Sequence, residues 1–175
     1  MGELTLFIGG AKSGKTKAAL KEAQRHPAPY YYLATAQGLD DEMRSRITHH
    51  QAERGPDWRT LESPLEPEKA ISSLEGDSPV LMDCVTLWFS NLLCESQDEF
   101  LPVGFFSDRV KRLLAAIREY KGPVIVVSNE LGSGMVPMDP MSRDYRDAIG
   151  VAHQLLAGEA QAVYLVVAGI PVRIK

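Results

Sequence analysis

The chain has 175 residues, of which 45% are hydrophobic and 24% are charged, a balance typical of one soluble globular domain rather than of a disordered or membrane-embedded chain. Its 19 basic and 23 acidic residues give a formal net charge of −4. This charge argues against general nucleic-acid binding, because lysine and arginine contacts to phosphate dominate that affinity. No signal peptide and no apolar run of ~20 residues is recognisable. We therefore expect a single cytoplasmic domain over residues 1–175, without stable membrane insertion.

Short apolar runs alternate with helical patterns along the chain. The apolar runs predict buried strands at residues 4–8, 30–35, 80–83, 124–128 and 163–168. Between them, the composition predicts helices at residues 15–25, 39–53, 87–95, 105–120 and 141–158. This alternation is typical of an α/β fold with a mostly parallel sheet that is covered by helices on both faces.

Two connections and the two cysteines complete the structural expectations. Residues 56–67 are turn-rich and polar and predict a surface connection. Residues 169–174 predict a tight turn into a short C-terminal edge strand, which would form a hairpin with the strand before it. Cys84 and Cys94 lack the CxxC spacing of a zinc site, so we expect two buried, reduced thiols.

The strongest motif follows the first predicted strand. The loop matches G-x-x-x-x-G-K-[ST] in full, with Gly9, Gly10, Ala11, Lys12, Ser13, Gly14, Lys15 and Thr16. Glycines let the backbone turn tightly and present N–H groups to phosphate oxygens, and the positive end of the following helix adds to the attraction. We expect Lys15 to reach the β- and γ-phosphates and the Thr16 hydroxyl to bind Mg²⁺. The motif thus favours a phosphate-binding loop over a glycine-rich turn without a ligand.

An acidic partner for this loop stands at the end of another predicted strand. The apolar residues 80–82 lead into Asp83, whose carboxylate would hold Mg²⁺ directly or through water. Alternatively, Asp83 would cap the helix that begins near Thr86 by accepting hydrogen bonds from free N–H groups. The presence of the phosphate-binding loop favours the metal role.

Two adjacent histidines lie in the helix predicted at residues 39–53. At helical spacing, His50 falls in the apolar stripe, whereas His49 lies outside it, beside Arg46. In general, a histidine pair on a helix is part of a solvated face. An outward histidine near a nucleotide can instead attack an α-phosphorus and form a covalent nucleotidyl-histidine, with Arg46 stabilising the charge on the phosphoryl oxygens. The spacing alone leaves both interpretations open.

Together these motifs resemble one family, the bifunctional adenosylcobinamide kinase/adenosylcobinamide-phosphate guanylyltransferases of cobalamin synthesis. The resemblance covers nearly the full chain, and its most specific parts are RIxHH after DDEM, at residues 40–50, and NExGxGxVP at residues 129–137. The other matching pieces are GGAKSGKT at 9–16, ATA at 34–36, WRT at 58–60 with Glu62, DCVT at 83–86 with NLL at 91–93, Arg143, Arg146 with Asp147, Gly150, QL at 154–155 and GIPVRIK at 169–175.

The resemblance implies a P-loop NTPase with a RecA-like sheet that forms a homotrimer. It implies that His49 becomes guanylylated, and with Lys15 and Arg46 this histidine makes up the expected catalytic set. Besides the loop at 9–16, the implied nucleotide contacts fall on Thr35, Ala36, Gln37, His50, Gln51, Ala52, Glu53, Glu62 and Asp83. The expected Mg²⁺ ligands are Thr16 and Asp83. The sequence departs from the family pattern where Asp83 replaces the Glu of some members and His153 replaces a common Asn.

The chemistry that the resemblance implies has two halves. In the first, the terminal phosphoryl group of ATP or GTP moves to the aminopropanol hydroxyl of adenosylcobinamide. In the second, His49 attacks the α-phosphorus of GTP, expels pyrophosphate and passes GMP to adenosylcobinamide phosphate, which gives adenosylcobinamide-GDP. One alternative is a P-loop small-molecule kinase without guanylyl transfer. Another is a RecA-like ATPase or interaction module that acts on nucleic acid or protein, against which the acidic balance counts.

Two further polar segments come after the fourth predicted strand. The first lies at the carboxyl edge of the sheet, where ligands bind in open α/β folds, and the second lies near the start of the last predicted helix. Asn129, Glu130 and the glycines at 132 and 134 would line the corrinoid side or a subunit contact, or form a structural loop whose glycines need positive φ. Arg143, Arg146 and Asp147 would bind phosphate in a neighbouring active site or form surface pairs.

Overall fold

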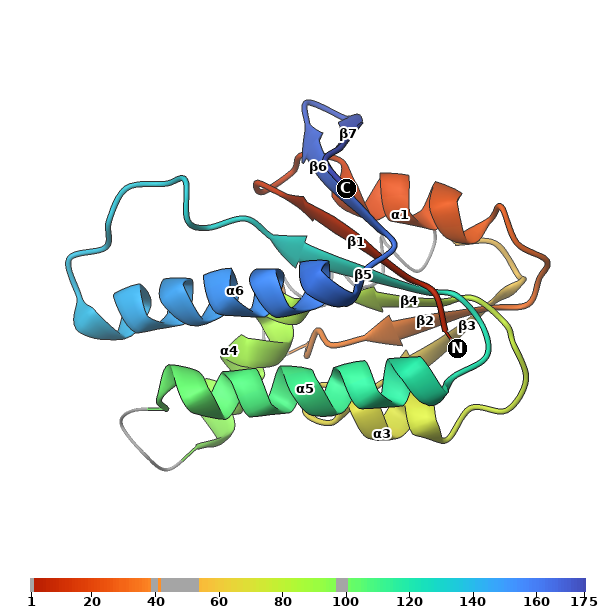
Figure 1. Cartoon of the computed structure of the whole chain (residues 1–175), viewed down its shortest axis with the longest axis horizontal. Coiled ribbons are helices and arrows are strands. Elements are labelled where there is room, and N and C mark those ends of the chain that lie inside the picture. Colours follow the sequence, from red (N-terminus) through yellow and green to blue (C-terminus); the bar gives the residue numbers. More distant parts are fainter. Residues whose placement is uncertain (1, 39–40, 42–53, 97–100) are drawn as a thin grey trace.

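The structure is a computed structural model, and it describes residues 2–38, 41, 54–96 and 101–175. Its strands are β1 (Leu4–Gly9), β2 (Tyr30–Ala34), β3 (Trp58–Glu62), β4 (Val80–Asp83), β5 (Val124–Asn129), β6 (Ala162–Val167) and β7 (Ile170–Arg173). The helices within the described residues include α1 (Lys15–Ala23), α3 (Pro67–Ser72), α4 (Val85–Glu95), α5 (Val103–Glu119) and α6 (Pro140–Glu159). The strands form one sheet in the order β3-β2-β4-β5-β1-β6-β7, in which only β7 runs antiparallel to its neighbour (Figure 1).

Helices cover both faces of this sheet (Figure 1). On one face, α1 packs over a core that includes Phe7, Leu81 and Ile125. On the other face, α4, α5 and α6 enclose a larger core around Trp88 and Phe89. The central strands β4, β5 and β1 therefore have buried side chains on both faces, which is why their sequences are nearly continuous apolar runs.

Most of the predicted elements are confirmed. The five predicted strands correspond to β1, β2, β4, β5 and β6, with each end within one residue of the prediction, and the C-terminal edge strand is β7. Four predicted helices correspond to α1, α4, α5 and α6. The helix predicted at residues 39–53 lies outside the described residues, apart from residue 41. No helix in the described part of the chain is long and apolar enough to cross a bilayer.

Two structural expectations are wrong. The segment at residues 56–67, predicted as a surface connection, contains β3. This strand lies at the edge of the sheet and its side chains are half-buried or exposed, so its sequence shows no apolar run, yet its backbone still pairs with β2. Cys94 is exposed, whereas Cys84 is buried as expected, and both are free thiols.

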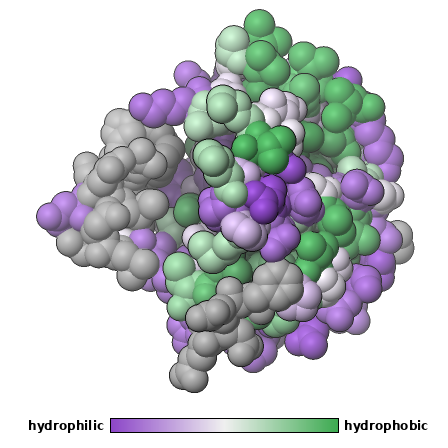
Figure 2. Space-filling model, turned by 90° about the vertical axis from the view of Figure 1, so that its left-hand side faces the viewer, coloured by the Kyte–Doolittle hydropathy of each residue, from purple (hydrophilic) through white to green (hydrophobic). Residues whose placement is uncertain are grey.

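The carboxyl ends of the parallel strands meet at one edge of the sheet. The register aligns Gly9 with Asn129 across β1 and β5, and Ala34 with Asp83 across β2 and β4. Figure 2 looks onto this edge and shows hydrophilic residues gathered at its centre and apolar residues at its top, where the β6–β7 hairpin lies. Gly9, Asp83 and Asn129, which belong to three of the sequence motifs, end their strands at this edge.

Two glycines of the described chain differ in the space that is available for a side chain. A Cβ at Gly158, in the last turn of α6, would meet no atom within 4 Å. Gly158→Ala should stabilise the protein by about 0.5–1 kcal/mol because alanine favours the helix, and raise the thermal unfolding midpoint by roughly 1–4 °C. A Cβ at Gly122 would lie 2.3 Å from the Asp77 carbonyl oxygen, so Gly122→Ala should lower that midpoint. Equal midpoints for the two variants would contradict this prediction.

Candidate active site

The loop between β1 and α1 has the shape of a phosphate cradle. A Cβ at Gly9 would lie 2.5 Å from the Val166 carbonyl oxygen, so no larger residue fits where β1 ends. Lys12 and Gly14 have positive φ values of 54° and 91°, which turn the chain back onto the N-terminus of α1 at Lys15. The first N–H groups of a helix have no intrahelical partners. The loop therefore combines a tight backbone turn with a helix N-terminus, the arrangement that binds phosphate oxygens.

Lys15 folds back across this loop. Its Nζ donates a hydrogen bond to the Gly10 carbonyl oxygen at 3.0 Å. The residue is only 8% exposed. Burial lowers the pKa of Lys15, and the Asp83 carboxylate partly offsets that effect. The amine is thus held inside the cradle, where a lysine of such a loop contacts the β- and γ-phosphates.

The Asp83 carboxylate contacts both the start of α1 and the strand β2. Its Oδ2 accepts hydrogen bonds from the Thr16 hydroxyl at 3.0 Å and from the Tyr32 hydroxyl at 2.8 Å. The alternative helix-capping role does not describe this carboxylate, because α4 begins after an N-cap at Cys84 that has no side-chain hydrogen bond. The structure thus brings the end of β4 to the start of α1.

The oxygens of Thr16 and Asp83 fit a magnesium ion that arrives with a nucleotide. They lie 3.0 Å apart, and Mg²⁺ prefers such oxygen ligands while it keeps water and phosphate oxygens in its other positions. Among the described residues, no group of three or more His, Cys, Asp or Glu side chains could hold a metal ion. The donor set therefore suits a metal shared with phosphates better than a metal held by the protein alone.

Tyr32 connects this carboxylate to Arg54. Neither residue is among the site residues predicted from the sequence. Burial raises the pKa of the Tyr32 phenol above its usual value, and the neighbouring Asp83 adds to the shift, so the hydroxyl stays protonated and donates to Asp83. The Arg54 guanidinium carbon lies 3.5 Å from the centroid of the Tyr32 ring, a cation–π contact. Within the described part of the chain, the buried Arg54 Nη1 has no hydrogen-bond partner. A guanidinium with a spare donor therefore lies beside the candidate metal site.

The predicted contacts on β2 and β3 lie at the same edge of the sheet. Thr35 is fully buried, and its hydroxyl donates to the Cys84 carbonyl at 2.8 Å and accepts from the Cys84 N–H at 2.7 Å. This exchange fixes the chain that follows Asp83, and Ala36 and Gln37, the next residues after Thr35, are half-buried. Glu62 ends β3 in register with Ala34. Burial also raises the pKa of Cys84 to about 11, so Cys84 remains a thiol.

Six of the predicted site residues lie outside the described residues. They are Arg46, His49, His50, Gln51, Ala52 and Glu53. The described chain resumes at Arg54, the residue that stacks on Tyr32. The residue next to this predicted segment is thus anchored at the candidate metal site.

The segment after β5 is fastened by side chains. Asn129 Nδ2 donates to the Thr86 hydroxyl at 2.8 Å, and the Tyr145 hydroxyl donates to the Thr86 carbonyl at 2.6 Å. Glu130 Oε1 accepts from the Gly132 N–H at 2.7 Å. Among the described glycines, positive φ occurs at 14, 76 and 169 and not in this loop, so the alternative of a loop whose glycines need that conformation is wrong.

The two arginines of α6 behave differently. Arg146 lies 3.3 Å from the Asp147 carboxylate, as expected for a surface pair. Arg143 Nη1 donates to the carbonyl oxygens of Pro137 and Met138, at 3.1 and 2.6 Å. Arg143 therefore holds the end of the β5–α6 loop against the start of the helix.

His153 packs against the end of β5. Its Nε2 lies 2.8 Å from the hydroxyl of the fully buried Ser128. Burial lowers the pKa of His153, and the Glu130 carboxylate partly offsets that effect. The imidazole is therefore less basic than an exposed histidine, and its protonation is coupled to packing between α6 and the sheet.

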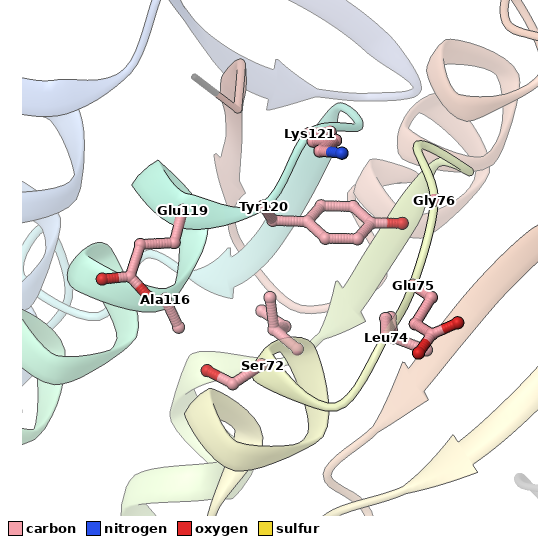
Figure 3. Close-up of a pocket in the computed structure, with 9 residues that line it drawn as sticks. Ser72, Leu74, Glu75, Gly76, Ala116, Glu119, Tyr120 and Lys121 are labelled. Atoms are coloured by element: carbon pink, nitrogen blue, oxygen red, sulfur yellow. The ribbon is translucent and has the colours of Figure 1, made fainter.

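A separate pocket of about 510 Å³ opens at the opposite, amino end of the sheet (Figure 3). It lies between α3, the end of α5 and the turn before β4, and the Tyr120 ring crosses it. Its charged lining consists of Glu75, Glu119 and Lys121, so carboxylates outnumber the single cation. This lining is poorly suited to phosphates and leaves the loop at residues 9–16 as the candidate nucleotide site.

The phosphate cradle after β1, the carboxylate at the end of β4 and the mostly parallel sheet define a P-loop nucleotide-binding α/β protein. The crystal structure of the RadB recombinase superposes with a TM-score of 0.52 at 20% identity, and the match covers 93% of this chain and 73% of that one. This similarity shows the RecA-like fold.

Comparison with known sequences identifies the family. Residues 5–174 match the family described as cobinamide kinase / cobinamide phosphate guanyltransferase. The bifunctional adenosylcobalamin biosynthesis protein CobP of Pseudomonas aeruginosa is 41% identical, and the match covers 97% of this chain and 96% of that protein. CobU of Salmonella typhimurium, described in the same words, is 38% identical over 98% of this chain and 99% of that protein. The chain belongs to the cobinamide kinase / cobinamide phosphate guanyltransferase family.

The Tyr32 hydroxyl should matter for metal binding more than for folding. In Tyr32→Phe, the Asp83 carboxylate loses one of two donors and can rotate away from Thr16. We expect the Mg²⁺ concentration for half-maximal kinase activity to rise about fivefold, the factor that corresponds to one hydrogen bond of ~1 kcal/mol. Tyr30→Phe is the matched control, because its hydroxyl donates to the distant His26 carbonyl. An equal shift in both variants would show that Tyr32 acts only through stability.

The buried His153 should make the protein sensitive to acid. Because its pKa is lowered on folding, the unfolded state binds more protons, and the stability that His153 contributes above its unfolded pKa is lost as the pH falls through its folded pKa. Urea unfolding should therefore show a loss of stability below pH ~6.5 of at most about 1.4 kcal/mol per pH unit from this group. His153→Asn, which has no titrating group there, should flatten this part of the profile. An unchanged acid slope in the variant would refute the assignment.

Proposed function

We propose that this chain phosphorylates adenosylcobinamide with ATP or GTP and Mg²⁺, and then transfers GMP from GTP to adenosylcobinamide phosphate through a guanylyl-histidine at His49. The observation that carries this proposal is the meeting of the cradle, Thr16 and Asp83 at one point in a chain of this family. That arrangement provides one place for nucleotide phosphates. The two half-reactions are then assigned to one domain over residues 1–175.

In the kinase half, the cradle holds the donor's phosphates through the N–H groups of residues 9–16, and Lys15 stabilises charge on the transferred group. Thr16 and Asp83 would hold Mg²⁺, which when bound neutralises phosphate charge. The substrate hydroxyl oxygen forms a bond to the γ-phosphorus, the bond to the β–γ bridging oxygen breaks, and the hydroxyl proton is released to solvent.

In the guanylyl half, a neutral ring nitrogen of His49 attacks the α-phosphorus of GTP, and pyrophosphate leaves. A phosphate oxygen of adenosylcobinamide phosphate then displaces His49 and forms adenosylcobinamide-GDP. Arg46 and Lys15 would stabilise the charge on the phosphoryl oxygens. The remaining proposed nucleotide contacts are Thr35, Ala36, Gln37, His50, Gln51, Ala52, Glu53, Glu62 and Asp83.

The position of Arg54 supports the placement of this second step. Arg54 follows the proposed contacts at residues 50–53 directly and lies against Tyr32, whose hydroxyl contacts Asp83. The first described residue after the proposed contacts at residues 50–53 therefore lies beside the phosphate site. A plain P-loop kinase without guanylyl transfer would share the cradle but would form no covalent adduct with GMP.

The family resemblance also leads us to propose a homotrimer in the cytoplasm. Support for assembly comes from exposed apolar side chains at the C-terminal edge of the sheet, where Ile170, Val172 and Ile174 are 65%, 49% and 58% exposed. Such apolar surface at a sheet edge favours contact with another chain.

Replacement of His49 should separate the two half-reactions. In His49→Ala we expect no guanylyl transfer but much of the kinase activity, because phosphoryl transfer does not use the imidazole. The measurement is incubation with α-labelled GTP, followed by acid and alkaline treatment of the protein, since a phosphorus–nitrogen bond to histidine is acid-labile. His26→Ala, which changes a histidine beyond the end of α1, is the control and should keep the label. Label retained on His49→Ala would refute the assignment.

A further inference from the structure

A second pocket, of about 390 Å³, lies beside the phosphate cradle between α1 and the β6–β7 hairpin. This volume falls within the ~300–1,000 Å³ range of small-molecule sites. The pocket is lined by Phe7, Gly14, Lys17, Ala18, Lys21, Glu22, Arg25, Tyr164, Gly169 and Pro171. None of the expected nucleotide contacts beyond the cradle is among these residues.

The pocket borders the cradle, because Gly14 of the loop is part of its lining and the hairpin is attached to the loop. The Gly169 N–H donates to the Ser13 carbonyl oxygen at 2.8 Å. A Cβ at Gly14 would lie 3.1 Å from Gly169 Cα, so the turn of the hairpin closely approaches the last glycine of the loop. A group bound in the pocket would therefore lie next to the last glycine of the loop, within reach of phosphates bound in the cradle.

The lining suits a nucleoside. The Tyr164 ring stacks on Phe7 with centroids 4.8 Å apart and planes 11° apart, which places aromatic surface in the pocket, and Pro171 adds an apolar wall. The polar lining is mainly cationic, with Lys17 and Lys21 on the exposed face of α1. Ring nitrogens and carbonyl oxygens of purines accept hydrogen bonds from such donors, and the same cations attract phosphates.

The pocket also contains a hydrogen-bond acceptor, the Glu22 carboxylate. Glu22 pairs with Arg25 at 3.1 Å, and its side chain is 22% exposed, so a carboxylate acceptor is fixed at the pocket. An exocyclic amine of adenine or guanine can donate to such an acceptor. The lining thus has partners for donors and acceptors of a purine, and it does not by itself choose between the two bases.

The position of the pocket relative to the sheet separates it from the other expected contacts. The cradle follows β1, and the pocket lies on the side of β1 where β6 and β7 are. Asp83, Thr35 and Glu62 lie at or just beyond the ends of β4, β2 and β3, on the other side of β1. A triphosphate in the cradle can therefore have its nucleoside on either side.

We propose that this pocket holds the purine nucleoside of the phosphoryl donor during the kinase half-reaction. The GTP that guanylylates His49 then has its nucleoside on the β2–β3 side of the same cradle. The inference rests on the proposed function for the placement of the phosphates and of His49. With the donor's nucleoside beside α1, its γ-phosphate extends toward Asp83, where the acceptor hydroxyl approaches.

Charge changes in the pocket should affect one half-reaction only. Lys21→Glu should raise the KM of the kinase for its nucleotide about tenfold with kcat within about twofold, the pattern of lost binding rather than lost catalysis. Lys21→Gln, which removes the charge without reversing it, should give a smaller increase. Arg112→Glu, an equal charge change on the exposed face of α5, is the control and should leave KM unchanged. The rate of guanylyl-His49 formation from α-labelled GTP should stay at the wild-type value in all three variants.

Equal losses in both half-reactions would show one shared nucleoside position and overturn the proposal, as would an unchanged kinase KM in Lys21→Glu. Photolabelling of the wild-type protein locates the nucleoside directly. With 8-azido-ATP and 8-azido-GTP in separate arms, we expect label on residues 17–25 or 164–171, and the arm with stronger labelling identifies the donor. Label confined to residues 35–37 and 62 in both arms would also overturn the proposal. Failure of the proposed function would be distinguishable, since it would appear as a missing GMP adduct in the wild-type protein whatever the photolabel shows.

Discussion

The carboxylate of Asp83 is the point on which the candidate site depends. Its Oδ2 receives hydrogen bonds from Thr16 at the start of α1 and from Tyr32 in β2, so one oxygen joins three elements of the fold. The parallel register of β2 and β4 holds Tyr32 opposite Leu81, close to the end of β4. Because this ladder lies inside the sheet, Tyr32 and Asp83 cannot separate without breaking backbone hydrogen bonds. A metal and phosphates bound here would therefore meet groups that are already in place, which would lower the cost of reorganisation during transfer.

Hydrogen bonds and side-chain packing also fix the segments on both sides of this carboxylate. Toward β2, the ring of Tyr32 supports Arg54, and the exchange between Thr35 and Cys84 fixes the turn after Asp83. Toward β6, the N–H of Gly169 holds the hairpin against the cradle. The flanks of the phosphate site are thus fixed by contacts to strands of the sheet, and each flank can present its own groups to whatever is attached to the phosphates.

The sequence was sufficient for the parts of the structure that depend on local pattern. Buried parallel strands are continuous apolar runs, and the loop at residues 9–16 has a spacing that its backbone geometry requires. The sequence could not predict the roles of residues that depend on contacts between distant parts of the chain. Tyr32 looks like a core aromatic until the fold brings its hydroxyl to Asp83, and nothing local distinguishes Arg54 from other surface arginines. The role of His49 comes from family resemblance and stays a prediction, because that residue lies outside the described chain.

A single phosphate cradle can serve two displacement reactions because it binds the triphosphate group, which all nucleoside triphosphates have in common. Backbone N–H groups and Lys15 recognise the phosphate chain and not the base, so they allow it to lie in either direction. The direction then decides which phosphorus faces which nucleophile. In the proposed arrangement, a nucleoside beside α1 would expose the γ-phosphorus on the Asp83 side, whereas a nucleoside beside β2 and β3 would bring the α-phosphorus toward Arg54. On this arrangement, the choice between phosphoryl and guanylyl transfer lies in the two flanks of the cradle, and the cradle itself need not change.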